Sequence, residues 1–244
     1  MKKIVVVILV HFFYAGFGQL PFNRIRENIN KNEDSGLLKT LDSCMAKGYH
    51  RDSTLYYMGL VNLKAKHITE AQNNYKMLRD EFPDFKESHY LHGMIYYINE
   101  SYGKSIDEFS LVIKNNPKHI KALYNRSVAL GQIDDFLSAI QDLDACISLN
   151  PKYTLAYYSR AYWYESVNNY VEASKDYERT LRLEPKNFDA YLGLAYAYQN
   201  MKENIKACET ITKAIAAGSR PCPRACCQPG HRADSHHHSG THSP

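Results

Sequence analysis

Apolar and polar residues alternate along this chain with the spacing of amphipathic helices, and prolines interrupt the pattern at regular intervals. Pro83, Pro117, Pro151 and Pro185 are each separated by 34 residues. Because a proline excludes the helical conformation at the residue before it, each of these four marks the end of a helix. A fixed period of this length indicates a repeat array, in which neighbouring units share one continuous core.

Alignment on the prolines divides residues 52–218 into five units: 52–85, 86–119, 120–153, 154–187 and 188–218. The eighth and twentieth places of every unit hold small residues, and the twenty-fourth place holds a large one. Two helices cross closely only where side chains are short, and a bulky neighbour then fills the groove. Each unit is therefore predicted to be a helix hairpin, with turns near residues 65–68, 99–102, 133–136, 167–170 and 201–204.

These features resemble the tetratricopeptide repeat (TPR) family over about residues 52–218. The family carries a large residue at the fourth place, and His89 is the weakest fit to this preference. The residues at this place in the five units are Leu55, His89, Leu123, Tyr157 and Tyr191. The resemblance implies an all-α fold, a right-handed α-solenoid of TPR-like helix hairpins. It also implies that the fifth and ninth places of each first helix face a concave groove.

The first residues, 1–18, have a charged start, a short apolar run and small residues near the end, which is the layout of a secretory signal peptide. The alternative is a retained membrane anchor, but the run is shorter than the roughly 20 apolar residues that a span needs. With cleavage before Gln19, the protein is expected to be exported and to be periplasmic or extracellular.

Residues 19–51 are predicted to lead into the array as a degenerate repeat. Leu37, Leu41 and Cys44 recur at helical spacing within them. Asp34 or Ser35 is expected to cap this helix, and Gly48 to end it.

The amino-acid composition changes abruptly in residues 219–244, where Pro, His, Cys and Arg predominate. We expect this segment to be disordered. They provide no covering cap for the last helix, so our hypothesis is that a reading-frame or assembly error replaced the rest of a longer array. Their cysteines and histidines match no ordered ligand spacing, so no metal site is predicted. Cys44, Cys146 and Cys208 fall on apolar helix stripes and are predicted to be core residues.

Charge and motifs narrow the possible functions. The formal net charge is +4, but the lysines of the leader and the arginines of the tail account for it, so residues 19–218 are neutral. A nucleic-acid partner would require a basic surface and is therefore not expected. The chain contains no phosphate-binding glycine loop, no paired zinc histidines and no nucleophile elbow. No enzyme activity, cofactor or small-molecule substrate is predicted.

Tyrosine supplies the candidate binding residues, because the chain has twenty tyrosines against one tryptophan. A tyrosine combines a large apolar face with a hydroxyl and loses little rotamer entropy on binding. The alternative is that these rings only pack between neighbouring helices. The fifth place of four consecutive units holds Tyr56, Tyr90, Tyr124 and Tyr158, and the ninth place of the last two holds Tyr162 and Tyr196.

Polar residues on the first helices have other expected roles. TPR domains that grip a C-terminal carboxylate use a cluster of Lys, Asn and Arg, of which only Asn125 has a counterpart here. Asn125 could hydrogen-bond a ligand backbone or support its own helix. Arg126 and Arg160 share the seventh place; they are predicted to form ion pairs with Asp142, Asp144 or Asp176, the alternative being ligand contact.

The sequence thus predicts a non-catalytic scaffold or adaptor that binds a peptide or partner helix in a Tyr-lined concave groove. The expected partner is a protein or peptide, including one in a membrane-associated complex. Two alternatives remain open: the docking or sensory region of a larger enzyme or signalling protein, and a structural component of an envelope assembly.

Overall fold

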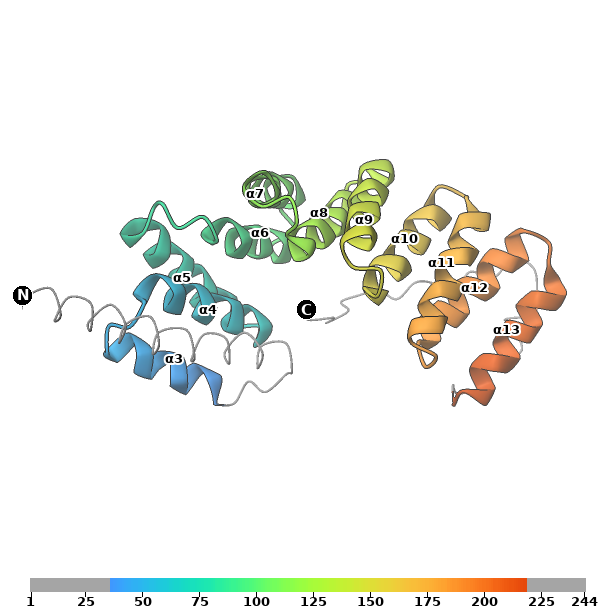
Figure 1. The fold of residues 1–244 in the computed structure, drawn as a ribbon, viewed down its shortest axis with the longest axis horizontal. Helices are drawn as coiled ribbons and strands as arrows, with labels where there is room; N and C mark the ends of the chain where they lie inside the picture. Colours follow the sequence, from blue (N-terminus) through green and yellow to red (C-terminus); the bar gives the residue numbers. More distant parts are fainter. Residues whose placement is uncertain (1–35, 219–244) are drawn as a thin grey trace, which may run out of the picture. The chain divides into compact units, whose positions relative to one another are not determined.

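The computed structural model describes residues 36–218, and every element in that range is a helix (Figure 1). The predicted signal segment and the Cys/His-rich tail lie outside the described residues. The chain forms two compact units that divide between Glu100 and Ser101. This boundary falls in the turn of the second predicted hairpin, 86–119, and the two units are described one after the other.

The first unit contains four helices: α3 (Leu37–Ala46), α4 (Arg51–Lys64), α5 (Ile68–Glu81) and α6 (Ser88–Ile98). Helix α3 has Gly36 at its N-cap. Asp34 and Ser35, the predicted capping residues, lie outside the described residues. Gly48, with φ 68°, follows the end of α3 as predicted, because glycine adopts this left-handed conformation without strain.

Helices α4 and α5 form a hairpin, and α6 packs against both of them. Close approach explains the small residue at the eighth place, since a Cβ built on Gly59 would lie 2.5 Å from Cδ2 of Leu91. Leu55, Leu78 and Leu91 are fully buried between these helices.

The second unit contains seven helices, which follow one another in series (Figure 1). Helix α7 packs on α8, and hairpins α8/α9, α10/α11 and α12/α13 come after it. The bounds are α7 (Tyr102–Asn115), α8 (Ile120–Gln132), α9 (Phe136–Leu149), α10 (Thr154–Ser166), α11 (Tyr170–Leu183), α12 (Phe188–Asn200) and α13 (Asn204–Ala216).

The five predicted turns are confirmed, and they share one backbone conformation. The fifteenth place of each unit has a positive φ between 57° and 63°, at Lys66, Glu100, Asp134, Asn168 and Lys202. Each second helix ahead of a period proline stops two residues before it, at Glu81, Asn115, Leu149 and Leu183, as the proline rule requires.

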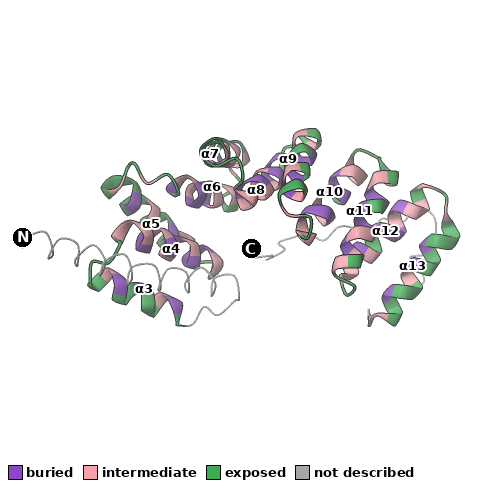
Figure 2. Ribbon diagram, in the orientation of Figure 1, coloured by how far each residue is buried: buried purple, intermediate pink, exposed green. Residues whose placement is uncertain are grey.

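Buried residues recur on every helix of the second unit (Figure 2), and they include places that the period singled out. Leu143 and Tyr177, both at the twenty-fourth place, are 0% and 1% exposed. Tyr177 lies so close to α12 that a Cβ on Gly193 would be 2.3 Å from its Cζ atom. A Cβ on Gly131 would be 2.2 Å from the ring of Trp163 in the same way.

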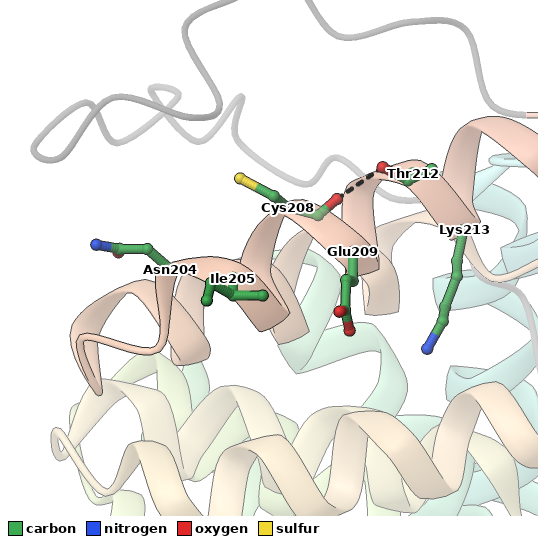
Figure 3. Close-up of a pocket in the computed structure, with 6 residues that line it drawn as sticks. All are labelled: Asn204, Ile205, Cys208, Glu209, Thr212 and Lys213. Carbon is green, nitrogen blue, oxygen red and sulfur yellow. Dashed lines mark hydrogen bonds between the residues drawn. The ribbon is translucent and has the colours of Figure 1, made fainter.

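Helix α13 is the last described helix, and its twenty-first place is more exposed than the same place in hairpins α8/α9 and α10/α11. Ile140 at the twenty-first place of its unit is 8% exposed, because α10 packs beside α9. Cys208 holds that place on α13 and is exposed, so its predicted burial is wrong, whereas Cys44 and Cys146 are buried as predicted. Cys208 lines a shallow pocket of about 590 Å³ together with Ile205, which is 78% exposed (Figure 3).

Candidate interaction surface

The first helices of the second unit carry a surface that we call the tyrosine face. It consists of the residues at their fifth and ninth places. Residues four apart on a helix lie on the same side, and α10 contacts both α8 and α12, so these places are neighbours within and between hairpins. The members of the tyrosine face are Tyr124 and Val128 on α8, Tyr158 and Tyr162 on α10, and Leu192 and Tyr196 on α12.

The fifth-place tyrosines of this face are partly buried. The Tyr124 ring packs edge-on against Tyr153 with centroids 5.5 Å apart, and its hydroxyl accepts a hydrogen bond of 3.4 Å from the Ser159 hydroxyl. The Tyr158 ring packs against Tyr177 at 5.8 Å. Burial raises the pKa of the Tyr158 phenol, and the negative charges of Asp189 and Glu165 raise it further. The Ser159 contact of Tyr124 therefore connects two hairpins, whereas the Tyr177 contact of Tyr158 lies within one hairpin, and both rings are partly accessible.

The two ninth-place tyrosines differ in exposure. Tyr162 is 41% exposed, and its ring stands edge-on to Trp163 at 5.0 Å, which holds it in place. Tyr196 is half-buried and contacts the Tyr170 ring at 6.1 Å. Leu192, which replaces tyrosine at the fifth place, is 49% exposed. The accessible part of the tyrosine face is thus centred on α10 and α12.

The remaining predicted site residues are placed differently. In the first unit, Tyr56 is half-buried between Tyr57 and Phe85, with ring centroids 5.2 Å and 5.8 Å away. Tyr90 on α6 is only 4% exposed, so little of this ring is accessible to a partner. Asn125 is half-buried on α8.

The predicted ion pairs of Arg126 and Arg160 are confirmed. Arg126 binds Asp142 with both ends of its guanidinium, at 2.8 Å and 2.7 Å, and donates to the Ser110 hydroxyl at 2.9 Å. Arg126 and Asp142 hold the seventh and twenty-third places of one hairpin, whereas Ser110 holds the twenty-fifth place of the hairpin before it. This guanidinium therefore connects two successive hairpins.

Arg160 repeats the arrangement one period later. It binds Asp176 at 2.7 Å and 2.8 Å and donates to Asp144 of the preceding hairpin at 2.6 Å. Burial opposes the charge on Arg160, yet its bonds to Asp176 and Asp144 raise its pKa above the usual value. Because both guanidiniums are engaged in these contacts, we assign them a structural role.

Sequence reasoning missed three residues beside the tyrosine face. Leu192 broke the tyrosine ladder and was therefore not counted, although it is among the most exposed large apolar residues. Glu165 accepts a hydrogen bond of 3.1 Å from the Tyr177 hydroxyl, and Asp189 lies exposed in the first turn of α12. Glu165 lies at the twelfth place of its unit and Asp189 at the second place, both on first helices. These positions could have identified them from the sequence.

Other kinds of site were also sought in the described part of the chain. Between residues 36 and 218, no group of three or more His, Cys, Asp or Glu side chains is arranged to hold a metal ion. No helix in that same range has the length and apolar character needed to cross a membrane.

The stacked helix hairpins place the chain in the α-solenoid class. Three stretches, residues 53–84, 120–153 and 176–209, match models of the tetratricopeptide repeat, so the chain contains tetratricopeptide repeats. A comparison with curated proteins gives no match.

Several solved structures share the fold. A MamA fragment from Desulfovibrio magneticus is 20% identical with a TM-score of 0.62, over 69% of this chain and 95% of that one. A tetratricopeptide repeat protein from Parabacteroides merdae is 19% identical with a TM-score of 0.59, over 83% and 80%. PilF from Pseudomonas aeruginosa is 14% identical with a TM-score of 0.62, over 70% and 78%. At these identities the likeness concerns the fold alone.

Proposed function

We propose that this protein is a non-catalytic scaffold or adaptor that binds a protein partner through the tyrosine face, by an extended peptide or one side of a helix. The repeats support the broader role, because TPR arrays typically serve as protein-interaction scaffolds. The observation that carries the proposed site is the exposure of Tyr162 and Leu192, 41% and 49%, on two successive first helices.

The chemistry of this face suits a peptide. Ring faces and an aliphatic side chain provide apolar area, and the tyrosine hydroxyls provide hydrogen bonds at low entropic cost. The fifth-place rings are held by packing, so the surface is already ordered before a partner arrives, which lowers the cost of binding. We further propose that the protein acts after export, on the basis of residues 1–18.

The test is selection of a random displayed peptide library on the purified full chain. Peptides recovered with the wild type are measured again with a Tyr162→Ala, Tyr196→Ala double variant. Loss of two exposed aromatic contacts is expected to weaken binding about tenfold or more.

The control is Tyr49→Ala, because Tyr49 is 55% exposed and lies in the first unit, in the loop before α4, and is not a member of the tyrosine face. Tyr162 and Tyr196 are chosen over the more buried Tyr124 and Tyr158, whose removal would also disturb packing. Helix content by circular dichroism should be unchanged in all variants. Peptides that bind the double variant as well as the wild type would refute the proposed site.

A further inference from the structure

Charge is distributed unevenly along the tyrosine face, and this distribution bears on the kind of partner. The first helices of the second unit carry five charged residues: Lys121, Arg126, Arg160, Glu165 and Asp189. Asp142, Asp144 and Asp176 bind the two arginines, so these contribute little to the field at the face. Lys121 lies on α8, two hairpins before α12. On the first helices, the charged residues that remain at the α10–α12 end of the face are therefore both acidic, Glu165 and Asp189.

Glu165 and Asp189 lie close to the aromatic rings at this end. The Tyr177 hydroxyl, whose ring packs on Tyr158, donates to Glu165 at 3.1 Å. Tyr158 packs in the same cluster as Ala190, the neighbour of Asp189. The raised pKa of the Tyr158 phenol has the same origin, since Asp189 and Glu165 both add to the effect of burial. Asp189 is exposed and forms no ion pair with any residue of the described range.

Aromatic faces flanked by carboxylates have a definite ligand preference. The negative face of a tyrosine ring attracts an ammonium or guanidinium group, and a nearby carboxylate strengthens the attraction. An acidic side chain or a C-terminal carboxylate would instead be repelled by the same two acids. The exposed Leu192 beside them adds an apolar contact for the stem of a long basic side chain or for its neighbour.

We infer that the α10–α12 end of the tyrosine face binds a Lys or Arg side chain of the partner peptide, over the rings of Tyr158 and Tyr162 and against Glu165 and Asp189. This inference rests on the proposed function and specifies the partner as a segment that combines apolar residues with a base.

The test uses the same random peptide library selected on the full chain. Wild-type selections should be enriched in Lys and Arg relative to the starting library. A recovered basic peptide should bind the Asp189→Asn variant about threefold more weakly, and its affinity should fall with added salt. Glu165→Gln should act in the same direction while keeping an acceptor for the Tyr177 hydroxyl.

The matched control is Asp107→Asn, which removes an equally exposed carboxylate from α7, a second helix. Peptides that depend on Tyr162 but contain no excess of Lys or Arg would overturn this inference and leave the proposed function standing. Basic peptides that bind Asp189→Asn and wild type equally would also overturn it. Peptides that do not depend on Tyr162 and Tyr196 would refute the proposed function itself.

Discussion

At the scale of single residues, Arg160 connects one hairpin to the next through two acids that differ in exposure. The side chain of Asp176 is 8% exposed, whereas that of Asp144 is 53% exposed. An ion pair is worth more where water is excluded, and a buried charge that loses its partner is costly. The two contacts of one guanidinium should therefore contribute unequally to stability.

This difference can be measured with two alanine variants. Asp176→Ala is expected to lower the free energy of unfolding by about 2 kcal/mol, because Arg160 loses two charge-assisted hydrogen bonds in a partly buried site. Asp144→Ala is expected to cost less than about 1 kcal/mol, because water screens the exposed carboxylate. Urea titration followed by circular dichroism measures both values. Equal losses would show that burial does not decide the strength of these pairs.

At the scale of elements, the hairpin turns explain why the helix bounds could be predicted. The prolines fix where second helices end, and the turn conformation at the fifteenth place fixes where first helices end. Glycine, asparagine and aspartate adopt the left-handed backbone conformation with little strain, whereas other residues adopt it at a higher conformational free energy. Asn168 and Asp134 suit this conformation, whereas Lys66, Glu100 and Lys202 do not.

A substitution at the last turn tests this difference. Lys202 has a φ of 63°. Its replacement by glycine is expected to raise the free energy of unfolding by about 0.5 kcal/mol, because the strain of the left-handed conformation is removed. Asn168→Gly, at φ 60°, is expected to change stability little. Thermal unfolding of both variants against the wild type provides the measurement. A loss of stability in Lys202→Gly would mean that the lysine side chain makes contacts that outweigh the strain.

At the scale of the whole molecule, the period predicted the helices of residues 52–218 but not the boundary of the two compact units. That boundary lies inside hairpin 86–119, where the 34-residue period is kept and His89 at the fourth place is the weakest fit to the repeat pattern. The sequence also could not rank the tyrosines by accessibility. The exposure of a ring depends on its neighbours in space, and among the predicted site tyrosines only the ninth-place Tyr162 is exposed, at 41%.

The buried tyrosines of the second unit should make its stability sensitive to alkaline pH. Burial raises the phenol pKa of Tyr124, Tyr158 and Tyr177 above the ordinary value of 10.0. The unfolded chain therefore releases these protons at lower pH than the folded chain does. The free energy of unfolding is therefore unaffected by these groups below pH 10.0, and it decreases as the pH rises above that value.

Tyrosinate absorbance and helical circular dichroism, recorded against pH, measure this effect. We expect part of the tyrosinate signal to appear only together with loss of helix, above the pH at which the urea-unfolded chain titrates. Complete ionisation of the tyrosines near pH 10 with the helices intact would contradict the assigned burial.

The contacts of Arg126 and Arg160 have a consequence for how such an array lengthens. Each guanidinium takes acceptors from the twenty-third place of its own hairpin and the twenty-fifth place of the one before. If a gene duplication inserted a second copy of residues 120–153 directly after the first, the new Arg126 would meet the Asp144 of the older copy. The Asp144 carboxylate that the inserted hairpin needs would thus already be present. Whole repeats could therefore be added to the array without a separate mutation at each new junction.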